Sequence, residues 1–380
     1  MVIGIPKEIL SGENRVAITP DTAAKLIKLG FEIVVETNAG LNAHFLDESY
    51  LQAGAKILSS AAEVYSAADV ICKVQKPIVD DSVNELKMMK KGTLLISFFF
   101  PLNYPQIARE SAAAGVDVIA MDFIPRITRA QKMDALSSQS NLAGYKSVLL
   151  AANHLGKIFP LLMTAAGTIT PSKVVIMGAG VAGLQALGTA KRLGAIVEVS
   201  DVRTAVKEEV LSLGGKFIEV EQDASLQDER GYAKEQSAEF LQKQKEVLFK
   251  HITQADIVIT TALIPGKKAP ILVSEEMIKN MKHGSVVLDM ATEFGGNCEL
   301  SEFNKTVVKH GVTIIGEANL PSLIPTQASE LYSKNILALL AEIGKGGTVN
   351  LDMSNDVVKE SLITHQGEVV NARIKPLVSQ

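Results

Sequence analysis

Histidine and cysteine are scarce in this chain, and neither is placed as a catalytic or metal-binding site requires. The two cysteines among 380 residues, Cys72 and Cys298, are far apart and form no C-x-x-C or other metal-binding spacing. No metal site is therefore expected, and two scattered cysteines fit a protein of a reducing compartment. None of the six histidines makes a convincing pair with a carboxylate or a nucleophile, so histidine-based acid–base catalysis is not indicated. They are His44, His154, His251, His283, His310 and His365.

A strong excess of one charge and long apolar segments are also lacking. The formal net charge is −4 with 21% charged residues, which gives no electrostatic reason to expect a nucleic-acid partner. The apolar stretch 158–172 has about fifteen residues and contains Pro160, whereas a membrane-spanning helix needs roughly 20. The first residues have the character of a strand and not of a signal peptide. We therefore expect a chain that does not cross a membrane by itself.

What the chain has in abundance is an alternation of strand-like and helical segments. With 380 residues, 47% of them hydrophobic, it is long enough for two domains, and the alternation indicates α/β architecture with parallel sheets. We predict two Rossmann-like doubly wound parallel-sheet domains. The expected strands are Val2–Ile5, Glu32–Glu36, Asp69–Val74, Thr93–Phe98 and Val116–Met121, then Val174–Met177, Ile196–Ser200, Lys216–Glu219, Ile257–Thr261, Ser285–Met290 and Thr313–Ile315.

Two long segments with apolar residues at helical spacing, Ser137–Phe159 and Thr326–Ile343, are predicted to join the domains. Two such bridges would return the C-terminus to the first domain. The expected domains are therefore a discontinuous one, 1–136 plus 321–380, and a second one, 137–320, with a cleft between them. At the start of the chain, Thr19 is expected to cap a helix that begins at Pro20 and ends at Gly30.

Only the second domain carries a glycine fingerprint, in the stretch 173–183. Gly178 allows a tight turn, Gly180 lets the backbone approach a pyrophosphate, and Gly183 lets helix and strand pack closely. A helix that starts near Val181 would direct free N–H groups and its positive dipole end at the phosphates. Asp201, at the end of the next strand, has the spacing of the acid that accepts the ribose hydroxyls of NAD. Together these residues predict a dinucleotide site.

Two neighbouring residues bear on which dinucleotide is bound. The Asp201 carboxylate would repel the 2′-phosphate of NADP, whereas Arg203 could accommodate it. We give more weight to the acid at the strand end and predict NAD(H). The polar segment 222–250 is too long for a plain turn and is expected to be a lid, a binding loop or a solvated excursion. Gly231 and Tyr232 would form its hinge and tip.

The opening motifs, 3–8 (Ile-Gly-Ile-Pro-Lys-Glu) and 13–20 (Glu-Asn-Arg-Val-Ala-Ile-Thr-Pro), resemble the family shared by alanine dehydrogenase and proton-translocating nicotinamide nucleotide transhydrogenase. Further segments are similar to the NAD(H)-binding component of the transhydrogenases, and the resemblance covers essentially the whole chain. These segments are 125–138 (Pro-Arg-Ile-Thr-Arg-Ala-Gln-Lys-Met-Asp-Ala-Leu-Ser-Ser), Gly231–Glu235, Thr260–Pro270 and Gly295–Cys298.

The resemblance implies direct hydride transfer between NAD(H) on this chain and NADP(H) on a partner subunit, coupled to proton translocation by membrane-spanning subunits. It further implies a homodimer attached peripherally, through its partners, to the cytoplasmic side of the membrane. Hydride transfer between two nicotinamide rings needs no general acid or base. It needs the reacting atoms held within about 3–3.5 Å of each other, so a chain poor in catalytic histidine is compatible with it.

By the same resemblance, Arg126 and Asp134 would orient the nicotinamide carboxamide, with a mutual ion pair as one arrangement. Gln131 would reach the ribose near the partner's cofactor, and Ser137 would contact the nicotinamide end. Arg126, Gln131 and Asp134 are thus the expected catalytic residues. The remaining cofactor contacts carried over are Val181, Val202 and Leu263 on the adenosine half, Gly231 and Tyr232 in a mobile loop, and Gln244 on the helix after it.

Two alternatives stay open. Arg15 and Lys73 occupy positions that resemble the substrate-binding pair of alanine dehydrogenase, which would make the chain a self-contained dehydrogenase. Against this, Phe98–Phe100 stand where that enzyme carries its catalytic histidine, and Glu293 stands where it has aspartate. The second alternative is a dinucleotide-binding subunit without turnover of its own.

Overall fold

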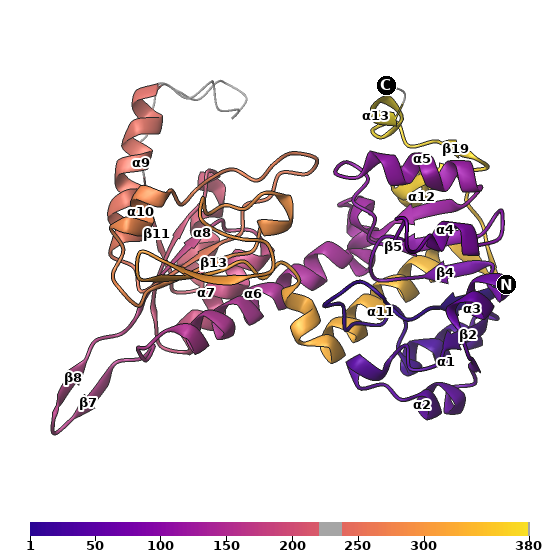
Figure 1. The fold of residues 1–380 in the computed structure, drawn as a ribbon, viewed down its shortest axis with the longest axis horizontal. Coiled ribbons are helices and arrows are strands. Elements are labelled where there is room, and N and C mark those ends of the chain that lie inside the picture. Colours follow the sequence, from indigo (N-terminus) through magenta and orange to yellow (C-terminus); the bar gives the residue numbers. More distant parts are fainter. Residues whose placement is uncertain (220–237, 379–380) are drawn as a thin grey trace. The chain divides into compact units, whose positions relative to one another are not determined.

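The computed structural model describes residues 1–219 and 238–378, and its elements are shown in Figure 1. The chain divides into two compact units. Unit 1 comprises Met1–Ser140 and Pro321–Gln380, and unit 2 comprises Asn141–Leu320. The boundaries expected from the sequence are 136/137 and 320/321. Each unit is a sheet covered by helices, so the predicted α/β class is confirmed.

Unit 1 contains an eight-stranded sheet in the order β19-β18-β6-β5-β4-β1-β2-β3. The six strands from β3 to β6 are parallel, and β18 and β19 continue the sheet in antiparallel fashion. The strands are β1 (Val2–Ile5), β2 (Glu32–Glu36), β3 (Lys56–Leu58), β4 (Val70–Cys72), β5 (Leu94–Ser97), β6 (Asp117–Ala120), β18 (Leu362–His365) and β19 (Glu368–Val369).

Alternate residues of these strands enter two different cores, one on each face of the sheet. Ile33 and Val35 belong to a core that includes Tyr332 of helix α11, whereas Val34 lies in a core that includes Tyr65 of helix α3. Burial on both faces explains the continuous apolar runs by which the strands were predicted. The helices are α1 (Pro20–Lys28), α2 (Asp47–Gln52), α3 (Ala61–Ala67), α4 (Glu85–Met88), α5 (Pro105–Ala114), α11 (Pro325–Ile343), α12 (Asp356–Ser361) and α13 (Lys375–Val378).

Unit 2 contains a seven-stranded sheet in the order β11-β10-β9-β12-β13-β15-β14, parallel except for β14. Helix α6 continues from unit 1 into unit 2. The strands are β9 (Lys173–Met177), β10 (Ile196–Ser200), β11 (Lys216–Phe217), β12 (Ile257–Thr260), β13 (Val286–Asp289), β14 (Thr306–Lys309) and β15 (Val312–Ile315). The helices are α6 (Ala135–His154), α7 (Val181–Arg192), α8 (Lys207–Ser212), α9 (Ala238–Thr253) and α10 (Glu275–Lys279).

Every strand predicted from the sequence is present, but several short ones were missed. β3, β14, β18 and β19 have two to four residues each and lie at or next to an edge, where the apolar signal is weak. Two small hairpins were also missed: β7 (Leu162–Thr164) with β8 (Gly167–Ile169), and β16 (Gly344–Lys345) with β17 (Thr348–Val349).

The helix boundaries follow the expected signals with one correction. Helix α1 begins at Pro20 and is followed by Gly30 with φ +96°, as predicted. Thr19 occupies the N-cap position, but its side chain makes no capping hydrogen bond. Its hydroxyl instead lies 3.4 Å from the hydroxyls of Thr22 and Ser333, because α11 packs against this end of α1.

Candidate dinucleotide site

The glycine turn follows β9, between the neighbouring strands β10 and β12. Gly178 has φ +111°, and a Cβ there would collide with the Thr261 hydroxyl. A Cβ at Gly183 would overlap the carbonyl oxygen of Gly178, so the helix can pack this closely only on glycine. Nothing lies within 4 Å of the Cβ position at Gly180. The turn therefore leaves open space at the glycine expected to approach a pyrophosphate.

Helix α7 begins directly at this turn. Gly180 is its N-cap and Val181 its first residue, so no side chain caps the first turn. The backbone N–H groups of a helix N-terminus have no partner within the helix, and they carry the positive end of its dipole. An uncapped N-terminus after a glycine turn is a suitable site for a phosphate group.

The Asp201 carboxylate is held by the glycine turn and by Arg203. Oδ2 accepts a hydrogen bond of 2.7 Å from the Ala179 backbone N–H, and Oδ1 accepts bonds from the backbone N–H (2.8 Å) and Nε (3.0 Å) of Arg203. Burial acts to raise the pKa of Asp201, but these hydrogen bonds and the guanidinium charge outweigh it and lower the pKa. Asp201 is thus an ionised acceptor at the strand end. Arg203, which could have accommodated a 2′-phosphate, is paired with it.

Three apolar residues expected near the adenosine are exposed around this turn. Val181 follows β9, Val202 follows β10 and Leu263 follows β12, and 41%, 74% and 50% of their surfaces are accessible. Carboxyl ends of parallel strands meet at one edge of a sheet, which is where ligands bind in open α/β folds. Apolar side chains placed there in solvent suit contact with a ligand and are not core.

Two buried residues that were not singled out from the sequence shape the loop after β12. Asp289 accepts hydrogen bonds from the backbone N–H groups of Ala291, Asn297 and Cys298. Asn297 in turn accepts from the Ala262 N–H (3.0 Å) and donates to the carbonyls of Ala262 and Pro270. The motif Gly295–Cys298 therefore supports the loop that carries Leu263. An acid at the end of β13 was the signal that could have indicated this role.

In unit 1, the segment expected to orient the nicotinamide forms a 3-10 turn, η3 (Thr128–Met133), before α6. Ala130 and Met133 are buried in the core, whereas Arg126 and Gln131 are exposed. The segment is thus anchored by apolar side chains and presents its polar ones to solvent.

Asp134 caps α6 and does not pair with Arg126. Its Oδ1 accepts from the Ser137 backbone N–H (2.9 Å) and its Oδ2 from the Ser137 hydroxyl (2.6 Å). Within residues 1–219 and 238–378 no ion pair joins Arg126 to Asp134, and both carboxylate oxygens of Asp134 are bonded to Ser137 instead. The first turn of α6 has backbone N–H groups without a partner in the helix, and Asp134 stands three residues before Ser137, the usual spacing for a side chain that caps a helix. Asp134 therefore bonds to Ser137 and not to Arg126.

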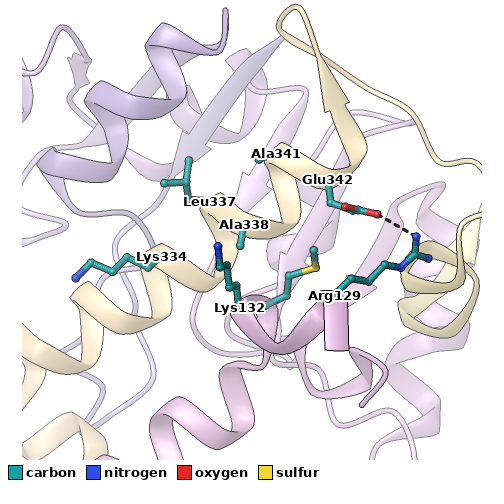
Figure 2. A pocket seen from close by; sticks show the side chains of 8 residues that line it. Arg129, Lys132, Lys334, Leu337, Ala338, Ala341 and Glu342 are labelled. Carbon is teal, nitrogen blue, oxygen red and sulfur yellow. Dashed lines mark ion pairs between the residues drawn. The ribbon is translucent and has the colours of Figure 1, made fainter. Parts of the chain in front are cut away.

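Next to this segment, η3 and α11 enclose an open hollow of about 600 Å³ (Figure 2). Its cations are Arg129, Lys132 and Lys334, and its floor includes Leu337. Figure 2 shows the ion pair between Arg129 and Glu342, which spans 3.6 Å. The hollow is therefore lined in part by η3, the segment that carries Gln131.

Family models match nearly the whole chain. The N-terminal domain of the alanine dehydrogenase/PNT family matches residues 4–143, and the C-terminal domain of the same family matches residues 147–372. The chain belongs to the alanine dehydrogenase/PNT family. The resemblance inferred from the sequence motifs is confirmed, and with it membership of an NAD-linked, dinucleotide-binding family.

Individual relatives favour the transhydrogenase branch of the alanine dehydrogenase/PNT family. A protein of Rhodospirillum rubrum, named as the first part of NAD(P) transhydrogenase subunit alpha, is 47% identical, with 98% of each chain covered. The protein of that name from Rickettsia prowazekii is 48% identical, with 97% of this chain and 96% of the relative covered. The alanine dehydrogenase of Bacillus subtilis is 30% identical, with 97% and 92% covered.

Among solved structures, too, a transhydrogenase is more similar to this chain than an alanine dehydrogenase is. A transhydrogenase from Sinorhizobium meliloti is 43% identical with a TM-score of 0.87, over 97% of this chain and all of that one. An L-alanine dehydrogenase is 27% identical with a TM-score of 0.82, over 100% and 99% of the two chains. The predicted two-domain Rossmann-type class is therefore confirmed.

Arg15 and Lys73, which resemble the substrate-binding pair of alanine dehydrogenase, are both paired with carboxylates of this chain. Arg15 is buried, and its guanidinium donates to Glu13 at 2.6 and 2.7 Å and to the Gln139 side chain at 2.8 Å. Burial acts to lower the pKa of Arg15, but Glu13 outweighs it and raises the pKa. The cation is thus engaged by this chain's own carboxylate.

Lys73 is held in the same way. Its buried ammonium lies 2.6 Å from Glu85 and 3.5 Å from Glu8. Burial alone would lower the pKa of Lys73, but the two carboxylates raise it, so the lysine stays charged and paired. At the position where the sequence resemblance would place the catalytic histidine of alanine dehydrogenase, Phe98 is buried and stacks on Phe100 with 5.7 Å between ring centres.

Three histidines do lie against carboxylates, contrary to the sequence expectation. His251 pairs with Glu198 at 2.6 Å, and His365 pairs with Asp117 at 2.8 Å. The third pair joins His310 to Glu275 at 3.1 Å. No local signal indicated these pairs, because the partners are distant along the chain. Glu198 also pairs with the first residue of β9, so this pair lies away from the carboxyl ends of the strands in unit 2. Asp117 begins β6, so the pair with His365 lies at the amino end of a strand of unit 1.

Some expected residues fall outside the described ranges. Gly231 and Tyr232 lie there, and Gln244 is in α9 without a described side chain.

Among described residues, no group of three potential metal ligands occurs. In the same portion of the chain, no helix has both the length and the apolar character needed to cross a membrane. Cys72 and Cys298 are free thiols, and burial raises the pKa of Cys298 to about 12.

Proposed function

We propose that this chain binds NAD(H) and passes a hydride directly between it and NADP(H) on a partner subunit, as one component of a proton-translocating transhydrogenase. The observation that carries the proposal is the internal pairing of Arg15 and Lys73 in a chain with a complete glycine turn. A nicotinamide can be held, but the two cations that would receive a small carboxylate substrate are neutralised. The hydride would then be exchanged with a second nicotinamide, carried by the partner subunit.

Each unit has a distinct role in this proposal. In unit 2, Gly178–Gly183 bind the pyrophosphate, Asp201 accepts the adenosine ribose hydroxyls, and Val202 and Leu263 cover the adenosine. In unit 1, polar residues of segment 126–137 orient the nicotinamide. Arg126 and Asp134 would contact the carboxamide and Gln131 the ribose. No proton need leave a substrate, so positioning is the whole catalytic task.

Partner subunits follow from the chemistry and from the names of the relatives. The similar proteins are each named as the first part of a subunit alpha, a name that implies further subunits in those complexes. We propose an NADP(H)-binding partner, membrane-spanning subunits that conduct the proton, and attachment of this chain to them on the cytoplasmic side.

We also propose a homodimer, and hairpin β7–β8 supports it. Residues 161–170 are all exposed, and no charged residue occurs between Lys157 and Lys173. Figure 1 shows the hairpin standing away from the sheet of unit 2. Two strands without further cover are marginally stable in water. A second copy would cover this apolar arm, and a hollow lined by Leu155, Phe159 and Leu193 lies at its base. One surface thus offers both a projection and a recess, as a two-fold contact requires.

The decisive experiment is reduction of an NAD analogue by NADPH, with and without a purified NADP-binding partner. Turnover that depends on the partner would support the transhydrogenase. Parallel reactions with NADH, pyruvate and ammonium in the absence of a partner test the alanine dehydrogenase alternative. Turnover there would overturn the proposal, and nucleotide binding without turnover in any reaction would indicate a non-catalytic subunit.

A further inference from the structure

Asn335, on α11, reaches both ends of the short segment that holds Asp134. Its Nδ2 donates to the backbone carbonyl of Lys132 at 2.9 Å, and its Oδ1 accepts from the Ser138 hydroxyl at 2.7 Å. Lys132 directly follows Gln131, and Ser138 lies in the first turn of α6. One side chain therefore ties the backbone on both sides of Asp134 to a long helix.

A second polar tie of this segment to the rest of unit 1 is more exposed. Arg129 pairs with Glu342 at 3.6 Å and with Asp356 at 3.3 Å, and it donates to the Asn355 side chain at 3.3 Å, but about half of the arginine side chain is exposed. Exposed ion pairs hold a geometry only loosely. The buried Met133 sets the depth of the segment, but apolar contact is not directional. Asn335 is itself buried, and its hydrogen bonds are directional.

We propose that Asn335 is a positioning residue for hydride transfer. It fixes the segment 126–137 in the place from which Gln131 and Asp134 orient the nicotinamide end, and this rests on the proposed function. A displacement of about 1 Å can cost a reaction on the order of 100-fold in rate. The contacts expected to give NAD(H) its affinity lie on other residues, at the glycine turn. Loss of Asn335 should therefore slow the hydride step much more than it weakens binding.

The test compares Asn335→Leu, which keeps the branched shape of the side chain and removes both hydrogen bonds, with Ser333→Ala on the same helix. Ser333 is also buried, but its hydroxyl accepts from the Thr19 N–H at 3.0 Å and does not touch the segment. Single-turnover hydride transfer is measured with the purified NADP-binding partner, and NADH affinity by fluorescence titration. If Asn335→Leu does not fold, Asn335→Asp keeps the acceptor, removes the donor and should change the rate in the same direction.

We expect Asn335→Leu to transfer hydride on the order of 10- to 100-fold more slowly, with the Kd for NADH within about twofold of wild type. Ser333→Ala should keep both values within about twofold. Amide hydrogen exchange over residues 131–138, measured without the partner, should accelerate only in the Asn335 variant. If the wild type is active and Asn335→Leu shows an unchanged rate, or loses rate and affinity equally, the role of Asn335 alone is overturned. A wild type inactive with its partner would overturn the proposed function as well.

Discussion

Asp201 accepts a 2.7 Å hydrogen bond from the backbone N–H of Ala179, in the middle of the glycine turn. The acid expected to bind the ribose therefore also fixes the loop expected to bind the pyrophosphate. Its second partner, Arg203, adds a 3.0 Å ion pair. Under the proposed function, this one carboxylate would couple the binding of the adenosine ribose to the binding of the pyrophosphate.

Replacement of Asp201 by asparagine should weaken NAD(H) binding. It should also reduce the preference of the site for NAD(H) over NADP(H). The variant keeps an acceptor for Ala179 but loses the charge that holds Arg203 and repels a 2′-phosphate. We expect a Kd for NADH about tenfold higher, which corresponds to about 1.4 kcal/mol, measured by fluorescence titration with both nucleotides. Arg203→Gln is the control, since it leaves the carboxylate in place and should keep the preference. An unchanged preference in Asp201→Asn would make that carboxylate purely structural.

Gly180→Ala should abolish NAD(H) binding without harming the fold. The Cβ meets nothing within 4 Å in the free protein, so only a bound pyrophosphate would be obstructed. Gly188→Ala, in the interior of the same helix, is the matched control, since its Cβ would meet only the end of the Arg192 side chain, at 3.8 Å. It should bind NADH normally and gain about 0.5–1 kcal/mol of stability. Thermal melts with and without NADH measure both effects, and a normal shift of the melting temperature by NADH in Gly180→Ala would contradict the assignment.

The sequence predicted the dinucleotide turn better than it predicted the loop of unit 1, for a physical reason. The turn depends on residues close in sequence: a buried strand, three glycines and the acid after the next strand. Arg15 has one partner, Glu13, only two residues away. Its contact with Gln139 in α6 and the contact of Asn335 with Lys132 in η3 join residues more than a hundred positions apart, so neither of these two contacts had a local signal. Asp134 was different. Its bond to Ser137 has the spacing of a helix cap, so a local signal for that bond was present in the sequence.

Arg126→Ala should reduce hydride transfer far more than nucleotide binding. Arg126 is exposed, so its removal should leave the fold intact while the carboxamide loses an orienting partner. Arg129→Ala is the control: it removes an equal charge three residues away, and its exposed pairs with Glu342 and Asp356 contribute little. Single-turnover rates with the NADP-binding partner and NADH titrations separate the two effects. Equal losses of rate and affinity in Arg126→Ala would reduce this arginine to a simple ligand contact.

Met163→Asp should convert the proposed dimer into a monomer. Met163 is 73% exposed near the tip of hairpin β7–β8, so an aspartate costs the isolated subunit little but would have to be buried uncompensated against a second copy. Sedimentation velocity checks the mass. Val308→Asp, at a similarly exposed apolar site on the edge strand β14, should leave the mass unchanged. A Met163→Asp protein that still sediments as a dimer would exclude the hairpin as the contact.

The last prediction concerns the dependence of stability on pH in unit 2. Asp256 accepts hydrogen bonds from Lys157 (2.9 Å), Lys282 (3.0 Å) and the Lys173 backbone N–H (2.8 Å). Burial acts to raise the pKa of Asp256, but these partners outweigh it and lower the pKa below the ordinary 3.8. A carboxyl with a depressed folded-state pKa stabilises the fold above its unfolded pKa, and this contribution is lost as pH falls through the folded value.

Asp256→Asn should therefore lose about 1–2 kcal/mol at pH 7, since hydrogen bonds to a charged group contribute about 1.5–3 kcal/mol and both lysines are partly exposed. The difference from wild type should shrink as the pH falls below about 4. Urea unfolding at a series of pH values gives both results. Glu302→Gln is the matched control, because that carboxylate pairs with Lys305 at the surface and should contribute little at any pH. A loss in Asp256→Asn that stays constant down to about pH 2 would mean that the shape of the side chain, and not its charge, stabilises the start of β9.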